Sequence, residues 1–146
     1  MDKQVLLEER RLHNLIFRNM RVCDAENKAP LSYRLRGMII GYLCEHEGED
    51  VYQKDLEAEF FVRGSTMTAS LAQLEEDGYI ERRQGVRDRR LKSVVATEKA
   101  KEIHSRFSAR VKEWEKRLID GIDPDELAIY FKVIDKLCSN MEAEKQ

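Results

Sequence analysis

Apolar residues recur every three or four positions over six stretches of the chain, which is the spacing of one face of an α-helix. The first stretch predicts a helix of about twenty residues near the N-terminus. The segment "DAENKAP" ends this helix, because the residue before a proline disfavours helical backbone. The apolar positions of this first helix are Leu12, Leu15, Ile16, Met20 and Cys23.

Three shorter helices follow. Ser32 is placed to cap the second helix, and "VYQKDLEAEF" predicts a short amphipathic third helix. The segment "FVRG" makes a tight connection to a fourth helix, "STMTASLAQLEEDG", for which Gly78 is a natural C-terminal stop. The inward-facing residues expected in the three helices are Leu35, Ile39, Ile40 and Leu43, then Leu56 and Phe60, then Met67, Leu71 and Leu74.

The periodicity changes after Gly78. "YIERR" and "LKSVVATE" contain β-branched and aromatic residues and flank a polar stretch with a glycine, which predicts a β-hairpin. The connecting segment "RRQGVRDRR" is short, and its length limits the reach of the hairpin tip.

Two long helices complete the pattern, and Thr97 is placed to cap the first of them. The segment "GIDPDE" separates them, with Gly121 as the stop, Asp123 as N-cap, Pro124 at the first helical position and Glu126 completing a capping box. The inward-facing positions are Ala100, Ile103, Phe107, Val111, Trp114 and Leu118 in one helix, and Leu127, Tyr130 or Phe131, Ile134, Leu137, Cys138 and Met141 in the other.

This order of elements contains two consecutive helices joined by a tight turn and followed by a hairpin. It predicts a winged helix-turn-helix, a mainly α fold with a small β-hairpin wing (α+β), whose second helix enters a DNA major groove. At 146 residues, of which 42% are hydrophobic and 37% charged, the chain is expected to be one domain with a substantial core.

Charge supports an anionic partner for the hairpin. The chain has a formal net charge of −2, yet residues 82–92 carry six positive side chains and one negative one, a local charge of +5. A solvated charged loop would explain this run taken alone. Its place at the tip of a wing favours DNA, because arginines at a hairpin tip enter the minor groove and contact phosphates.

Candidate DNA contacts lie on the fourth helix and on the wing. Short or hydroxyl- and amide-bearing side chains on the outer face of the helix let the backbone approach base edges closely. Asp88, two residues before Arg90, either braces an arginine by a bidentate pair or accepts backbone N–H bonds as a turn residue, and the two roles are compatible. The candidates are Arg63, Ser65, Thr66, Thr68, Ala69 and Gln73 on the helix, and Arg87, Asp88, Arg89 and Arg90 on the wing.

The segment from about Met38 to Ala100 resembles the MarR family of bacterial winged-helix transcriptional regulators. The matching motifs are "YLCEHEG", "DLEAEF", "STMTASLAQLEEDGYIERR" and "DRRLKSVVATEKA". In the last motif Asp88, Arg90 and Thr97 fall on the fixed positions of the family's wing signature.

Three positions depart from the family pattern. Tyr52 stands where a Ser or Thr cap is usual, which leaves Asp50 to cap the third helix. Arg63 stands where a small polar cap is common, and Ala96 replaces a leucine of the wing strand. None of the three removes a residue of the expected DNA-binding surface.

The resemblance implies a homodimer in which the helices at both ends of the chain, about 4–24 and 99–143, interlock beside a winged-helix lobe at about 33–98. A two-fold dimer presents two recognition helices about one DNA turn apart, which calls for a pseudo-palindromic operator. We therefore predict a sequence-specific regulator of transcription that binds double-stranded DNA, a repressor released by an unknown signal.

The family often binds a small acid or aromatic compound between the dimerisation helices and the DNA-binding lobe. His13, Met20, Met38 and Tyr42 are candidate lining residues of such an effector pocket, although ordinary core packing explains them as well. Some members instead sense oxidants through a cysteine near the start of the first helix, whereas Cys23 lies near its end. A winged helix used for protein–protein docking is a further alternative, which would favour exposed aromatic residues on the fourth helix.

No other chemistry is indicated by the sequence. Cys23, Cys44 and Cys138 are odd in number and form no CxxC motif, so neither a disulfide framework nor a zinc site is expected. The three histidines are scattered, and no arrangement suggests an enzyme, a metal site or a cofactor. Without an apolar run near about 18 residues or a signal peptide, the protein is expected in the cytoplasm.

Overall fold

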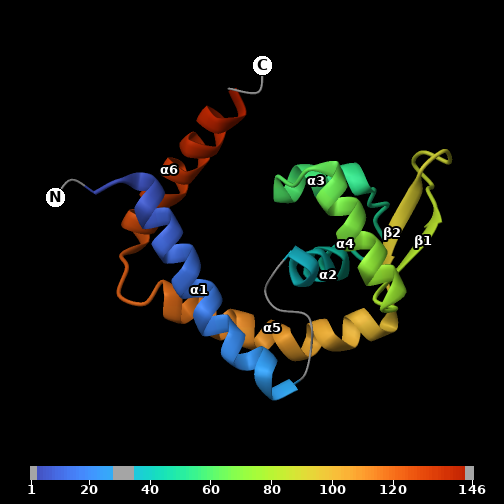
Figure 1. The fold of residues 1–146 in the computed structure, drawn as a ribbon, viewed down its shortest axis with the longest axis horizontal. Coiled ribbons are helices and arrows are strands. Elements are labelled where there is room, and N and C mark those ends of the chain that lie inside the picture. The colour runs from blue at the N-terminus through green and yellow to red at the C-terminus, as the bar shows by residue number, and fades with distance from the viewer. Residues whose placement is uncertain (1–2, 28–34, 144–146) are drawn as a thin grey trace. The chain divides into compact units, whose positions relative to one another are not determined.

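The computed structural model describes residues 3–27 and 35–143 (Figure 1). The winged-helix order of elements is confirmed within them, and the chain divides inside its fifth helix into two compact units, Met1–Ser105 and Arg106–Gln146. The elements are α1 (Val5–Asn27), α2 (Leu35–Glu45), α3 (Gln53–Phe60), α4 (Gly64–Glu76), β1 (Ile80–Gln84), β2 (Lys92–Ala96), α5 (Glu98–Leu118) and α6 (Pro124–Ala143).

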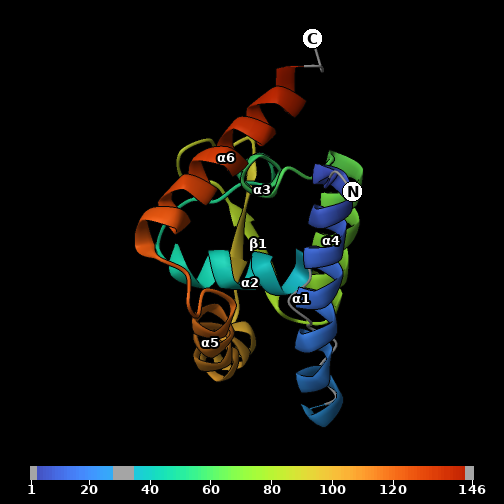
Figure 2. The ribbon, with the colours of Figure 1, turned by 90° about the vertical axis from the view of Figure 1, so that its left-hand side faces the viewer.

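The core of the first unit is built mainly by α2, α3, α4 and the hairpin, which we call the lobe, and Ala100 at the start of α5 packs into it (Figure 2). Ile39 of α2, Leu56 of α3 and Leu71 of α4 are completely buried, and Val94 of β2 is 2% exposed. Fully burying one such side chain contributes about 1.5–3 kcal/mol. The inward faces expected for these helices are therefore confirmed, and their burial stabilises the lobe.

A tight turn of residues 61–63 joins α3 to α4. Phe61 adopts the left-handed conformation, with φ of 50°, and its side chain is 66% exposed. At the far end of α4, Gly78 also has a positive φ, of 80°, and ends the helix as expected, since glycine takes this conformation without steric cost.

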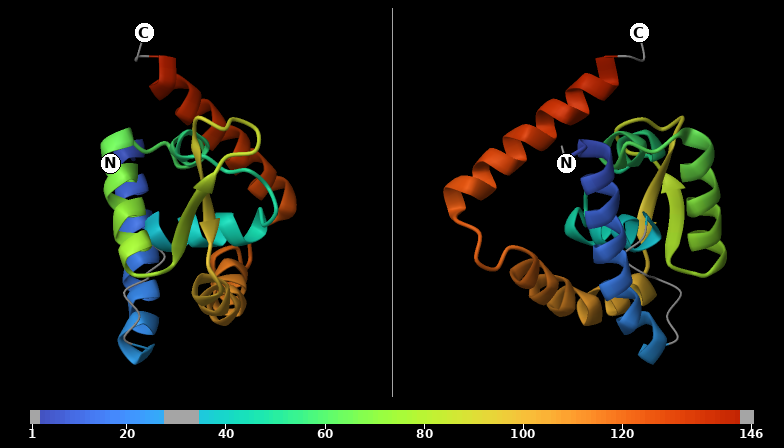
Figure 3. Two further views of the ribbon diagram at one scale, coloured as in Figure 1. Left: turned by 90° about the vertical axis from the view of Figure 1, so that its right-hand side faces the viewer. Right: turned by 60° about the vertical axis from the view of Figure 1, so that its left-hand side comes forward.

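The hairpin pairs β1 and β2 antiparallel, with Ile80 opposite Ala96 and Gln84 opposite Lys92 (Figure 3). The hairpin is also joined to the loop between α2 and α3, because the Val94 N–H donates to the carbonyl oxygen of Val51 over 2.7 Å. This bond fixes the base of the hairpin against the helix-turn-helix.

Thr97 caps α5 as the sequence predicts. Its hydroxyl donates to the carbonyl oxygen of Gly78 over 2.7 Å and accepts the Ala100 N–H over 3.4 Å. The cap therefore ties the start of α5 to the end of α4.

The first helix is longer than the sequence indicated. α1 runs from Val5 to Asn27 and includes the first four residues of "DAENKAP", so the helix does not stop where that segment begins. Only two residues, Lys28 and Ala29, separate Asn27 from Pro30, so the prediction extended the proline's influence too far back along the chain. Ser32 and the side chains of Met20 and Cys23 lie outside the described residues.

The second unit contains the rest of α5 and α6. Asp123 caps α6, since its carboxylate accepts the Asp125 N–H over 2.8 Å, and Glu126 accepts the Asp123 N–H over 3.3 Å. The expected capping box is confirmed, as is Gly121, whose φ is 77°. No described helix is long and apolar enough to cross a membrane.

The apolar face expected to turn inward on α6 is not buried within this chain. Leu127, Ile134 and Leu137 are half-buried, whereas Tyr130 and Phe131 are 42% and 54% exposed. In the described part of α6 no side chain is buried, and Cys138 and Met141 are exposed as well. Two helices in succession cannot enclose a core by themselves, which explains the difference from the lobe.

Candidate nucleic-acid interface

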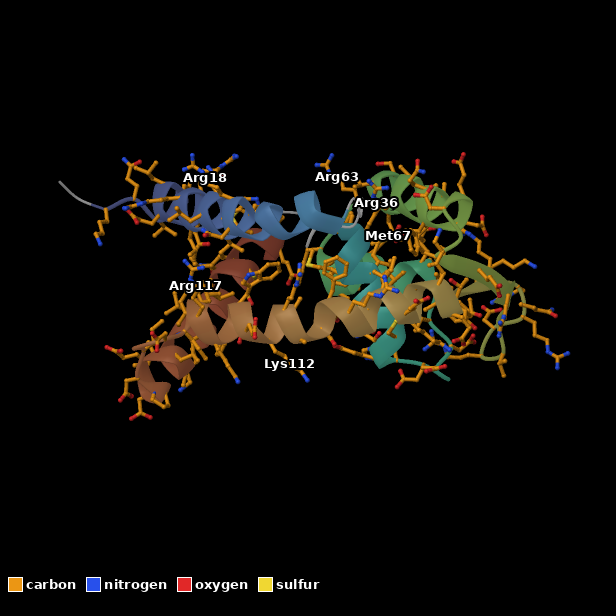
Figure 4. The ribbon with its side chains drawn as sticks, turned by 90° about the horizontal axis from the view of Figure 1, so that it is seen from below. Arg18, Arg36, Arg63, Met67, Lys112 and Arg117 are labelled. Atoms are coloured by element: carbon orange, nitrogen blue, oxygen red, sulfur yellow. The ribbon has the colours of Figure 1, made fainter. Side chains whose placement is uncertain are left out.

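Helix α4 has two chemically distinct faces. Met67, Leu71 and Leu74 are completely buried on the inner side. Figure 4 shows Met67 on that side and Arg63 at the start of the helix, turned away from the lobe. The outer face carries mostly short side chains that are exposed to solvent, and the exposed candidates are Arg63, Ser65, Thr66, Thr68, Ala69 and Gln73.

The start of α4 is open but is supported from α3. Arg63 is the N-cap residue and makes no side-chain cap bond, so the first N–H groups of α4 are not capped by it. Gln53 was not anticipated from the sequence: its side-chain amide donates to the Thr68 hydroxyl over 2.8 Å and lies 3.4 Å from the Gly64 carbonyl oxygen. A helix N-terminus with open N–H groups suits a phosphate.

Acidic residues of neighbouring elements reduce the charge of the basic wing segment, residues 82–92. The Arg82 guanidinium lies 3.7 Å from the Glu75 carboxylate, Arg83 lies 3.1 Å from Glu81, and Arg87 lies 3.0 Å from Asp55. These three carboxylates lower the local charge from +5 to +2. The sequence could not show this, because the partners of Arg82 and Arg87 lie on helices.

Asp88 fills both of the roles considered for it. Its two carboxylate oxygens each accept a bond of 3.1 Å from the Arg90 guanidinium, and Oδ1 also accepts the Arg90 N–H over 3.0 Å. These bonds lower the pKa of Asp88 and raise that of Arg90. The Arg90 side chain remains 90% exposed, so it is fixed in direction and still accessible.

Asp50 does not cap α3, which corrects the expectation drawn from the missing Ser or Thr. Tyr52 is itself the N-cap residue, and its N–H donates to the Asp55 carboxylate over 2.8 Å. The Asp50 carboxylate instead accepts the backbone N–H groups of Val86 and Arg87 on the wing. A tyrosine side chain is too long to bond its own helix terminus as serine does, so the acid in the first turn takes over the capping.

A sequence model of the MarR family matches residues 33–91. The described part of this match runs from α2 through α4 and β1 into the wing, and so contains the helix-turn-helix. Over residues 33–91 the chain therefore matches the MarR family.

Solved structures of MarR-family and related regulators share the fold over nearly the whole chain. Staphylococcus aureus MepR in complex with DNA is 18% identical, with a TM-score of 0.84 over 94% of this chain and 96% of that one. The regulator MarR from Oenococcus oeni PSU-1 is 21% identical, with a TM-score of 0.73 over 92% and 96%. The haem sensor PefR, solved with haem and carbon monoxide, is 23% identical, with a TM-score of 0.60 over 94% and 92%. At these identities the likeness establishes the fold.

The effector residues expected from the MarR-family resemblance are not brought into one described site. The first unit has an open cleft of about 530 Å³, and of His13, Met38 and Tyr42, the candidates whose side chains the structure describes, only Tyr42 lines it. His13 pairs its ring with Phe17 of α1 at 4.4 Å, and Met38 is half-buried. The remaining lining residues of the cleft are Glu49, Asp50, Val51, Asp55, Ala58, Glu59, Phe61 and Arg87.

Two cysteines, Cys44 and Cys138, have described side chains, and Cys44 offers little support for redox sensing. Burial raises the pKa of the half-buried Cys44 thiol, which favours the less reactive protonated form. Cys138 is exposed on α6. Within the residues that the structure describes, no group of three or more His, Cys, Asp or Glu side chains is arranged to hold a metal ion.

Proposed function

We propose that the protein is a sequence-specific regulator of transcription that binds double-stranded DNA as a homodimer and acts as a repressor. The observation that carries the proposal is the division of α4 into a completely buried apolar face and an exposed face of short polar residues. The outer face has no packing role, and its small side chains allow close approach to base edges in a major groove.

The wing supplies the second contact of the proposed complex. Arg90 is exposed and held in one direction by Asp88, which suits insertion into a minor groove. No ion pair is recorded for Arg89 or Lys92 among the described residues, so their charges are available to phosphates. The DNA-bound neighbour MepR, which shares this fold, supports the assignment.

The terminal helices support the homodimer. Leu6 and Leu7 of α1 are 86% and 57% exposed, and Ile129 and Phe131 of α6 are 62% and 54% exposed. Apolar surface of this extent is typical of an interface. A two-fold dimer would present two copies of α4 to the two halves of a pseudo-palindromic operator.

Selection of bound fragments from the host's genomic DNA tests the proposal and yields the operator. The parent protein should enrich a small set of fragments that share a pseudo-palindrome. Thr66→Val and Thr68→Val should then change the preference among operator point variants, since each removes one hydroxyl, and leave nonspecific binding nearly unchanged. Ser139→Val on α6 is the matched control and should change neither. A failure to enrich any fragment would contradict the proposal.

Protein–protein docking is the second candidate function, and the exposed Phe61 is the observation that favours it. The outer face of α4 carries no aromatic residue among its described positions, which favours DNA. Phe61→Ala separates the two, because a DNA regulator should keep its operator affinity while a docking module would lose its partner.

The releasing signal and the location in the cytoplasm stay predictions. PefR is a haem sensor with this fold, which supports the presence of an effector without specifying its chemistry here.

A further inference from the structure

Two side chains from the segment before α3 hold the loop at the tip of the wing, residues 85–91. The Asp50 carboxylate accepts the N–H groups of Val86 over 2.8 Å and of Arg87 over 2.7 Å. The Tyr52 hydroxyl donates to Asp50 and accepts the Asp88 N–H over 2.7 Å. Three successive amides of an exposed loop are thus bonded to side chains more than thirty residues earlier in the chain.

Arg87 is folded back onto the same residues. Its guanidinium carbon lies 4.7 Å from the centre of the Tyr52 ring, and its Nη2 lies 3.0 Å from the Asp55 carboxylate. Both a cation–π contact and an ion pair therefore hold this side chain against the lobe. Arg90, three residues later, is turned outward by Asp88 and is 90% exposed.

Gly85 gives independent evidence that the Tyr52 hydroxyl packs closely against the loop at the tip of the wing. A Cβ atom at this position would lie 2.5 Å from the Tyr52 hydroxyl oxygen and 2.4 Å from the carbonyl oxygen of Asp88. The second contact is with backbone, which cannot move aside without changing the loop. Glycine therefore permits the close approach on which the hydrogen bond between Tyr52 and Asp88 depends.

We propose that Asp50 and Tyr52 are positioning residues for DNA recognition, which fix the wing loop so that Asp88 presents Arg90 to the groove. Arg87 completes a latch, the name we give to Asp50, Tyr52 and Arg87, and is a positioning residue rather than the direct DNA contact expected from the sequence. The inference rests on the proposed function, since it assigns roles within the same DNA-binding surface. It also gives a purpose to Tyr52, which departs from the family's usual Ser or Thr.

The first experiment tests the latch without DNA. Tyr52→Phe removes the hydroxyl, keeps the ring beneath Arg87 and leaves the net charge unchanged. Amide hydrogen exchange followed by NMR should accelerate about tenfold or more at Asp88 and its two preceding neighbours, and should not change at the buried amides of α4. Tyr79→Phe is the matched control, because Tyr79 is equally buried, at 5% exposed, and lies outside the latch.

The second experiment is a double-mutant cycle on operator affinity. Tyr52→Phe should weaken operator binding about tenfold, the scale of one well-placed groove contact. In an Arg90→Ala background the same change should cost almost nothing, because the latch acts through Arg90. Arg87→Ala should likewise weaken operator binding only when Arg90 is present. If Arg87 contacted a phosphate directly, its removal would weaken binding in both backgrounds.

Equal losses in the two backgrounds, or unchanged operator affinity in Tyr52→Phe, would overturn the inference and leave the proposed function standing. If the parent protein selects no DNA, the proposed function fails and the positioning role fails with it. Should Tyr52→Phe not fold, as judged by circular dichroism, Asp50→Asn replaces it, because it removes the carboxylate charge while keeping the side-chain shape.

Discussion

The helices of the lobe and α6 share the same helical pattern of apolar and polar residues, yet of the two only the lobe buries its apolar faces within the chain. Leu71 of α4 is completely buried, whereas Phe131 of α6 is 54% exposed. The lobe surrounds its core with three helices and a hairpin, and Ala100 of α5 completes it. The comparison shows that an apolar stripe along a helix predicts that this face will be buried. It does not predict whether the residues that bury the face belong to the same chain.

The strongest test of this comparison places charge on α6. Ile134→Glu with Leu137→Glu should dissociate the proposed dimer, because two carboxylates cannot remain ionised in an apolar interface. Light scattering should show a monomer, and operator affinity should fall by about 10²–10⁴-fold once the second half-site no longer gains from linkage. Ser139→Glu with Asn140→Glu adds equal charge to exposed polar positions of the same helix and should leave the dimer intact. A folded monomer that binds the full operator as tightly as the parent would refute the dimer.

Shortening an apolar side chain should destabilise the protein in both regions, but only on α6 should the size of the effect depend on protein concentration. Leu71→Ala should lower the free energy of unfolding by about 2–5 kcal/mol at any concentration, since it opens a cavity inside one lobe. Leu137→Ala should instead lower the unfolding temperature most at low concentration, where subunits separate. Thermal unfolding at several concentrations measures both, and identical concentration dependence would remove the distinction between the two regions.

The DNA-binding side of the lobe should respond to changes that leave its core intact. Arg90→Ala should weaken operator binding by about 1–3 kcal/mol through loss of a groove contact, with no change in the unfolding temperature. Arg117→Ala, on the last turn of α5, is the matched control and should bind as the parent does. Fluorescence anisotropy with a labelled operator gives the affinities, and an equal loss in both variants would indicate a nonspecific charge effect.

The smallest expected effect concerns the start of α6. Asp123→Ala removes the carboxylate that accepts the Asp125 N–H and should cost about 1 kcal/mol of helix stability. Asp120→Ala, a nearby acid just beyond α5, serves as the control. Faster amide exchange confined to the first turn of α6 is the expected readout, and an unchanged Asp125 amide would show that the cap contributes nothing.

Local chemistry made much of this fold predictable. The buried residues of α4, the stop at Gly78 and the capping box at Asp123 depend on neighbours within a few positions, so the sequence indicates them directly. The C-terminal end of α1 was harder to predict, because the number of residues over which a proline disfavours the preceding helix is not fixed.

The features of the candidate site that the sequence did not predict join residues far apart along the chain. Asp50 accepts amides of the wing, and Asp55 pairs with Arg87, across more than thirty residues. Periodicity carries no information about such pairs. The one available signal was Tyr52 at a helix start, where its length makes capping unfavourable and suggests another partner.

The ion pairs of the basic wing segment also give the arginines built-in counterions. An arginine that stays paired with its carboxylate neutralises no phosphate, so it releases no condensed counterion from the DNA and adds little to the ionic-strength dependence of binding. Six uncompensated cations per wing would give a slope of log affinity against log salt of about −5, whereas a charge of +2 gives about −2. Attachment of this protein to DNA should therefore tolerate changes in cellular salt better than its number of basic residues suggests.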